Sequence, residues 1–172
     1  MDITKYMNKA ISIATIALDE GELPVGAIIV HKDKILAESY TQDRKQQRRL
    51  AHAEFLVLDQ VDKLKPSTVE RKNMMLFTNL EPCILCLGAA MAFGIGKIYY
   101  ALESPIDGAS KLLNYYFDKK EYSLGYSIPD IQGGILREES KNLFKKYITL
   151  HPTDGIIQWT KLLLETVSRN TR

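Results

Sequence analysis

Two short runs of the chain bring together one imidazole, one carboxylate and two thiols, and few folds can accommodate both. The first run is Ala51-His52-Ala53-Glu54, and the second is Pro82-Cys83-Ile84-Leu85-Cys86. The whole chain has only these 2 cysteines and 3 histidines. Imidazole nitrogen and thiolate sulfur are preferred zinc ligands in proteins. The fold must therefore bring the two runs together if they serve one metal ion.

The small number of cysteines bears on the kind of metal site. A structural zinc site has four protein ligands, whereas a catalytic site has three and leaves one position to water. A closed site would need His31 or His151 in addition to His52. His31 falls in a predicted hairpin turn, and His151 precedes a proline in a predicted loop. Three ligands, from His52, Cys83 and Cys86, with one open position are the simpler prediction.

Both runs are predicted to begin helices. Pro82 is favoured at a first helical position, and residues 83–93 contain no strong helix breaker before Gly94. Cysteines three residues apart share one helix face, and the helix start favours their thiolate form. Glu54 follows His52 by two residues and would lie at the same helix end. Its carboxylate could there take a proton from a metal-activated water and deliver it to a leaving group.

Other uses of these residues remain open. A Cys-x-x-Cys pair after a strand also fits a thioredoxin-like redox pair, and a closed zinc site would be purely structural. Taken alone, His52 is more typical of a core histidine, and Glu54 of a surface glutamate. Only the joint pattern with Pro82, Cys83 and Cys86 favours a hydrolytic metal site.

The composition indicates one globular domain. The 172 residues are 45% hydrophobic and 26% charged, which is enough to bury one substantial core. No apolar run approaches the ~18 residues of a membrane helix, and the N-terminus lacks a secretory signal pattern. Because both cysteines belong to one site, we expect a cytoplasmic protein. A net charge of +2 does not by itself predict nucleic-acid binding.

The hydrophobic periodicity predicts alternating strands and helices. Helices are predicted over residues 3–20, 52–61, 83–93, 106–116, 136–147 and 155–167. Strands are predicted over residues 24–30, 35–40, 73–78, 97–101 and 126–131. These elements would form an α/β fold of three layers, α/β/α, with a mixed sheet of about five strands. The β-α-β unit around Cys83 places the metal residues at the carboxyl end of a strand, where ligands bind in open sheets.

Three further features bear on ligand binding. Residues 41–49 form a basic loop, which we interpret as solvated or, alternatively, as a group of cations that attracts phosphates. Trp159 is interpreted as a packing anchor of the last helix and not as a base-stacking platform. Phe77 is interpreted as a core residue.

The two runs together resemble the signature of zinc-dependent nucleobase deaminases. The chain is similar to the cytidine and deoxycytidylate deaminase superfamily, and within it most to the tRNA adenosine and guanine deaminases. The similarity covers about the first 150 residues and includes Leu23-Pro24-Val25-Gly26-Ala27, Gly94-Ile95-Gly96-Lys97-Ile98 and Gly133-Gly134-Ile135-Leu136. It implies a deaminase domain over residues 1–150 and a helical extension over residues 151–172, packed on the same domain.

The resemblance implies one Zn²⁺ per chain with a bound water or hydroxide, ligands His52, Cys83 and Cys86, and Glu54 as the catalytic acid and base. The expected reaction is hydrolytic deamination of an amino-substituted nucleobase in a free base, nucleoside or nucleotide. The alternatives are a wobble-adenosine deaminase of tRNA and a non-enzymatic, zinc-stabilised subunit. Glu54 disfavours the last, because a structural site does not need it. A homodimer is also implied.

Three residues are predicted to contact the substrate: Thr41, Asn79 and Asp107. Thr41 lies eleven residues before His52, where the tRNA adenosine deaminases usually carry an asparagine. Asn79 ends a predicted strand, and Asp107 lies in a turn-like segment. Because Thr41 and the C-terminal extension depart from the tRNA branch, we expect a small nucleobase compound as substrate in preference to RNA.

Overall fold

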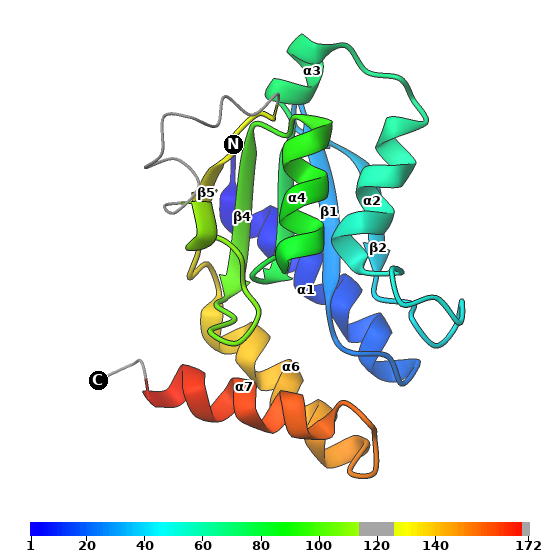
Figure 1. The fold of residues 1–172 in the computed structure, drawn as a ribbon, viewed down its shortest axis with the longest axis vertical. Helices are drawn as coiled ribbons and strands as arrows, with labels where there is room; N and C mark the ends of the chain where they lie inside the picture. Colours follow the sequence, from blue (N-terminus) through cyan, green and yellow to red (C-terminus); the bar gives the residue numbers. More distant parts are fainter. Residues whose placement is uncertain (114–125, 170–172) are drawn as a thin grey trace.

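A five-stranded mixed sheet forms the centre of the computed structural model, which describes residues 1–113 and 126–169 (Figure 1). The strands are β1 Gly26–His31, β2 Lys34–Tyr40, β3 Met75–Leu80, β4 Lys97–Leu102 and β5 Asp130–Gln132. Their order across the sheet is β2-β1-β3-β4-β5. β1 is antiparallel to β2 and β3, whereas β3, β4 and β5 are parallel to one another. The predicted mixed sheet is confirmed.

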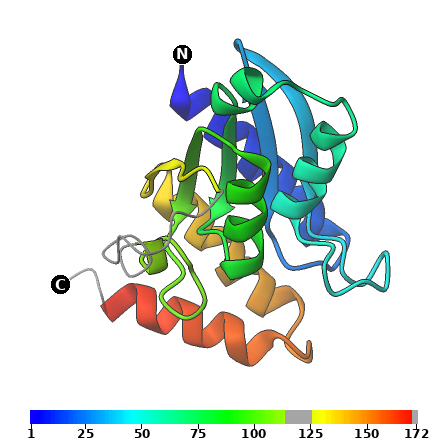
Figure 2. The same ribbon diagram turned by 45° about the horizontal axis from the view of Figure 1, so that its top comes forward.

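Helices cover both faces of this sheet (Figures 1 and 2). α2 Ala53–Asp62 and α4 Ile84–Phe93 lie on one face, and α1 Ile3–Asp19 lies on the other together with α6 Arg137–Leu150. α7 Ile157–Arg169 packs against α6 and crosses near one end of the sheet. The predicted three-layer arrangement is confirmed. None of the helices within residues 1–113 and 126–169 has the combination of length and hydrophobicity that a membrane span requires.

Alternating side chains of the strands fill a core on each face. Ile29 of β1 belongs to the core beneath α2 and α4, whereas the preceding residue, Ile28, belongs to the core beneath α1. Phe77 of β3 also lies in the α1 core, where its ring stacks on Tyr99 with 4.8 Å between the ring centroids. Phe77 is therefore a core residue, as predicted.

Gly26 and Asn79 hold α1, β1, β3 and α6 close together. A Cβ at Gly26 would lie 2.4 Å from the backbone nitrogen of Ala14, so only glycine permits this approach of α1 to the sheet. The Asn79 side chain accepts a hydrogen bond from the Gly26 N–H at 2.8 Å and donates to the Pro24 carbonyl at 2.9 Å. It also donates to the Ser140 hydroxyl of α6 at 3.1 Å, and this hydroxyl donates to the Asn79 carbonyl at 2.6 Å. The carboxyl end of β3 is thereby fixed.

One short helix was not predicted. α3 Thr68–Lys72 begins with a capping box in which Ser67 and Glu70 satisfy each other's backbone N–H groups. The Ser-x-x-Glu spacing is a sequence signature of a helix start. This signature is present in the sequence, but no apolar run follows it. Accordingly, no residue of α3 is buried.

Two predicted boundaries on the β5 side are wrong. The helix predicted over 106–116 does not begin at 106, where the chain forms a turn, and residues 114–116 lie outside the described residues. The strand predicted over 126–131 is reduced to the three residues of β5. The first difference falls where backbone N–H groups of Ser104 and Ser110 donate to the carboxylate of Glu81, just after β3, a tertiary contact that local periodicity cannot reveal.

Candidate metal centre and active site

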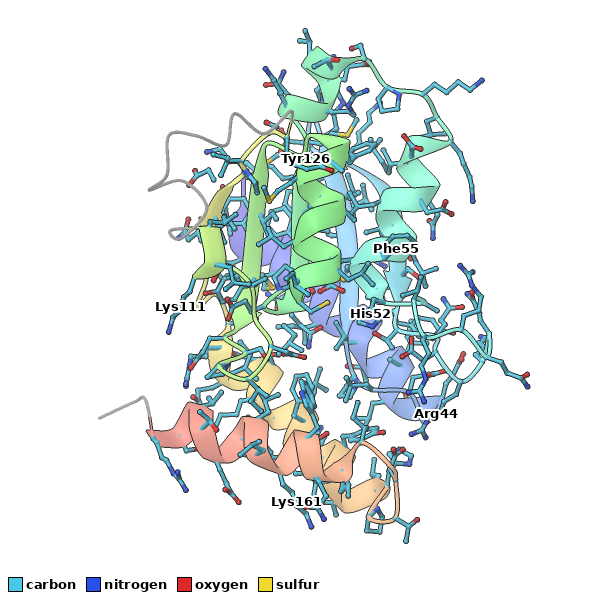
Figure 3. All side chains as sticks on the ribbon, in the orientation of Figure 1. Arg44, His52, Phe55, Lys111, Tyr126 and Lys161 are labelled. Carbon is cyan, nitrogen blue, oxygen red and sulfur yellow. The ribbon has the colours of Figure 1, made fainter. Side chains whose placement is uncertain are left out.

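The starts of α2 and α4 meet at the carboxyl end of β3. His52 is the N-cap of α2, and Cys83 is the N-cap of α4. Neither side chain caps its own helix. Instead, the Nδ1 atom of His52 lies 3.5 Å from Sγ of Cys83 and 3.5 Å from Sγ of Cys86 (Figure 3 labels His52). Pro82 was predicted to occupy the first helical position. It instead precedes the N-cap, Cys83.

The three donor atoms fit a tetrahedral metal ion. They all lie within 4.8 Å of one another. With Zn–N at about 2.0–2.1 Å and Zn–S at about 2.3 Å, tetrahedral angles place nitrogen and sulfur ligands about 3.5 Å apart. This matches the two observed distances. Across residues 1–113 and 126–169, His52, Cys83 and Cys86 form the one such cluster.

The other two histidines do not join this cluster. His31 ends β1 at the hairpin, and the ring of His151 packs against Tyr147 with 5.0 Å between the centroids. A closed site with two histidines is therefore excluded by the fold. Three side chains that can hold a metal leave a fourth position open.

Hydrogen bonds distribute protons among the three donors. The hydrogen bond from the Cys86 thiol lowers the pKa of Cys83 to about 4. The hydrogen bond with Cys83 raises the pKa of His52 to about 9, and the thiol–thiolate hydrogen bond together with burial raises the pKa of Cys86. A metal ion binding here at neutral pH would displace protons from His52 and Cys86.

Glu54 lies in the first turn of α2, directly beside the donor cluster. Glu54 is only 4% exposed to solvent. The Thr78 hydroxyl of β3 donates to Glu54 Oε1 at 3.2 Å, and the Cys86 sulfur lies 3.6 Å from Oε2. Burial raises the pKa of Glu54, which brings its proton exchange closer to neutral pH. A carboxyl group so placed can accept and return a proton at a reacting water.

A cavity of about 270 Å³ opens onto this cluster. Its walls include His52, Glu54 and Cys83, and also Thr41 and Asp107, two of the residues predicted to contact the substrate. Five residues that the sequence analysis singled out therefore line one cavity, which the fold assembles from separate segments.

The third predicted substrate residue, Asn79, lies elsewhere. It is fully buried, and its amide makes the hydrogen bonds to Gly26, Pro24 and Ser140 described above. The physical reason is the strand alternation, because Thr78 faces Glu54 and the next side chain points to the opposite face. We therefore assign Asn79 to the fold and leave it out of the proposed substrate contacts.

Glu81 is a cavity residue that the sequence did not single out. Its carboxylate is buried and accepts hydrogen bonds from the N–H groups of Ser104 at 2.9 Å and Ser110 at 3.1 Å. These bonds hold the 104–110 loop against the start of α4 and so place Asp107 at the cavity. The acidic residue between Leu80 and Pro82 was the feature of the sequence that could have indicated this role of Glu81.

The C-terminal helix also reaches the cavity. Ile156, just before α7, and Trp159 of α7 line it together with Asp43 of the loop that precedes His52. Trp159 also packs against the main core, as predicted, but its indole is at the same time part of the cavity wall. Treating Trp159 as packing alone was therefore incomplete. The division of the chain at residue 150 stays a prediction.

An ion pair joins the α6–α7 connection to the loop before His52. The Arg44 guanidinium donates to the carboxylate of Asp154, whose side chain is 2% exposed. The Tyr147 hydroxyl donates to the same carboxylate at 2.7 Å, and the Ile156 N–H donates to it at 2.9 Å. Burial alone would raise the pKa of Asp154, but these hydrogen bonds outweigh it and lower the pKa to about 2.

Asp154→Asn is expected to lower the free energy of unfolding at pH 7 by about 1–2 kcal/mol, allowing for partial solvent screening. The depressed pKa means that this contribution is present above the unfolded-state pKa of about 3.9 and disappears as the pH falls toward 2. Urea denaturation of both proteins between pH 7 and pH 2 measures it. A difference that stays constant over this range would contradict the assignment.

Comparison with known proteins places this cluster in a family. Residues 1–102 match the model of the cytidine and deoxycytidylate deaminase zinc-binding region. The chain belongs to this family. Among curated relatives, the tRNA-specific adenosine deaminase of Bacillus subtilis is 30% identical over 142 residues, which cover 83% of this chain and 86% of the relative. The enzyme of the same name from Rickettsia felis is 30% identical over 146 residues, covering 82% and 96%.

Solved structures of the deaminase family share the fold. A structure from a study of A-to-I editing by tRNA:A34 deaminases has a TM-score of 0.70 at 28% identity, and the match covers 81% of this chain and 99% of that one. A guanine deaminase from Nitrosomonas europaea has a TM-score of 0.67 at 18% identity, covering 86% and 85%. About a fifth of this deaminase-family chain thus has no counterpart in the first structure.

Proposed function

We propose that this protein is a zinc-dependent hydrolase that removes the amino group of a nucleobase carried as a free base, nucleoside or nucleotide. The observation that carries the proposal is the buried carboxyl group of Glu54 beside the three-donor cluster, with both at one cavity. The match to the deaminase zinc-binding region supports it.

His52, Cys83 and Cys86 would hold the metal ion. When bound, the ion supplies a Lewis acid with one position open to water. The role of the protein is then to hold the donors in place with two helix starts, whose N–H groups and dipoles favour thiolate sulfur. The cavity walls of Leu80, Ile156 and Trp159 restrict bulk water around the reacting carbon.

Glu54 would move the protons of the reaction. It takes a proton from the attacking water and delivers it to the amino nitrogen of the base. A C–O bond forms, the C–N bond breaks, and ammonia leaves, so that one water is consumed for each amino group released. Thr78 keeps the carboxyl group oriented through its hydrogen bond to Oε1. Thr41 and Asp107 are proposed to contact the base.

The second candidate is deamination of the wobble adenosine of tRNA. The 30% identity to the Bacillus subtilis tRNA-specific adenosine deaminase favours it. Thr41 and the cavity wall formed by Ile156 and Trp159 favour a small substrate instead. A non-enzymatic, zinc-stabilised subunit is the third candidate, and burial of Glu54 disfavours it. The homodimer and the cytoplasmic location stay predictions.

A panel of amino-substituted compounds tests the proposal. Metal-loaded protein is incubated with adenine, guanine and cytosine, with their nucleosides and 5′-monophosphates, and with a tRNA anticodon stem-loop, and ammonia release is followed. The proposal expects turnover of at least one small compound. Turnover confined to the stem-loop would support the second candidate. Absence of turnover by the metal-loaded protein on the whole panel would reject the first two.

A further inference from the structure

The C-terminal helix supplies part of the wall of the cavity at the metal donors. Ile156, just before α7, and Trp159 of α7 both line this cavity together with His52 and Cys83. The region matched by the family model ends at residue 102 and therefore includes neither Ile156 nor Trp159. Figure 3 shows His52 on the side of α7 that faces the sheet and Lys161 on the opposite side of the helix. A molecule held in the cavity can therefore contact the metal site and α7 at the same time.

A stripe of apolar side chains on α7 faces the rest of the domain. Its members follow one another at intervals of three or four residues, as one helix face requires: Ile156, Trp159, Leu163 and Val167. Leu163 and Val167 are completely buried in the main core. Trp159 packs against the same core but is only partly buried. The part of its indole that the core does not cover is therefore available at the cavity.

Hydrogen bonds tie both ends of α7 to the domain. At its start, the Asp154 carboxylate accepts from the Arg44 guanidinium, and it also accepts from the Ile156 N–H at 2.9 Å. At its end, the Arg137 guanidinium donates to the Val167 carbonyl at 3.1 Å. The two arginines come from the loop before α2 and from the start of α6. The indole is thus presented to the cavity in a fixed position.

The uncovered part of an indole is a binding surface for a planar ring. Bases stack on aromatic side chains, and every base has a π-face that permits this contact. Among the described residues that line the cavity, the only other aromatic ring is the imidazole of His52, whose Nδ1 atom is turned to the two cysteine sulfurs. The cavity of about 270 Å³ is smaller than the pockets of about 300–1,000 Å³ that enclose drug-sized ligands. It suits a single base, and Trp159 is the residue on which that base can stack.

We propose that Trp159 is a substrate-binding residue whose indole stacks on the base held in the cavity. α7 is then part of the active site, in addition to its packing on the domain. This inference rests on the proposed function, because it takes the occupant of the cavity to be a nucleobase. It adds a binding residue that lies outside the region matched by the family model.

Intrinsic fluorescence tests this contact directly, because Trp159 is the only tryptophan of the chain. The metal-loaded Glu54→Gln protein is titrated with adenine, guanine and cytosine and with their nucleosides. The same additions to N-acetyltryptophanamide correct for light that the bases absorb. Saturable quenching by at least one compound is expected, because a base that stacks on an indole quenches its emission. Quenching by none of the compounds would overturn the inference.

Two replacements of Trp159 separate stacking from packing. Trp159→Phe keeps an aromatic ring, whereas Trp159→Leu keeps only apolar bulk. In the Glu54→Gln background, Trp159→Leu is expected to raise the dissociation constant of the quenching compound by on the order of 10-fold, and Trp159→Phe is expected to restore most of this loss. Isothermal titration calorimetry measures both constants without relying on the tryptophan. Equal constants for the two variants would overturn the inference, because packing alone does not require a ring.

Leu162→Ala is the matched control on the same helix. Leu162 is 50% exposed and is not part of the cavity wall, so the dissociation constant should not change. A loss as large as that of Trp159→Leu would contradict the inference, because it would mean that any weakening of α7 affects binding. Ammonia release in the panel tests the proposed function separately. Turnover of a compound whose affinity is the same in the Trp159→Leu variant would reject this inference alone.

Discussion

Glu54→Gln is expected to lower the rate of ammonia release by at least about 10²–10⁴-fold, the usual contribution of a positioned acid or base. Glutamine has nearly the same shape as glutamate and can still accept the Thr78 hydrogen bond at Oε1. The fold and the donor cluster should therefore persist. The amide cannot take or return a proton, so the loss should fall on kcat, with the metal content of the protein unchanged.

The matched control for this variant is Glu38→Gln. Glu38 lies on β2, and its ion pair with Lys9 is largely exposed, so the same loss of charge should leave the rate unaffected. Steady-state kinetics and elemental analysis of both variants decide the matter. Near-normal turnover by the Glu54 variant would remove this residue from the mechanism, whereas loss of metal from it would show a structural role.

Cys83→Ala is expected to cause the second largest effect, a loss of metal affinity of more than about 100-fold with a parallel loss of activity. Replacing a residue that merely supports a ligand typically costs 10–100-fold in affinity, so removing a ligand should cost more, roughly beyond that range. Cys83 is partly exposed at an N-cap where its side chain makes no capping bond, so alanine should be tolerated by the fold.

Ile84→Ala, at the next position, serves as the control for the cysteine variant. Ile84 is 64% exposed and holds no donor atom. Competition with a metal indicator measures affinity in both variants, and circular dichroism checks the fold. If the Cys83 variant bound metal as tightly as the unmodified protein, this sulfur could not be a ligand.

The metal residues could be predicted from the sequence because each chemical requirement is local. His52 and Glu54 are two residues apart at one helix start, and Cys83 and Cys86 share the start of another. Ligand type and spacing restrict these residues to few arrangements. The long apolar run of β3 then fixes the end of the sheet at which the two helix starts meet.

The residues that the sequence missed are placed by distant contacts. Glu81 lies at the cavity because it binds Ser104 and Ser110, and Trp159 lies there because α7 is anchored through Asp154. Neither contact produces a pattern of hydrophobic periodicity in the sequence, because each joins residues that are far apart along the chain. Asn79 shows the opposite error, since a polar residue at a strand end looks the same whether it faces a cavity or the core.

The measurement that tests the central claim most directly is a metal titration of the unmodified protein. Metal is removed with a chelator, zinc is returned in steps, and ammonia release from a compound turned over in the panel is recorded at each step. Activity should be lost on removal and should rise in proportion to added zinc until each chain holds one ion. Full activity in the metal-free protein, or no stoichiometric zinc binding, would contradict the assignment of His52, Cys83 and Cys86 as the ligands of a catalytic metal.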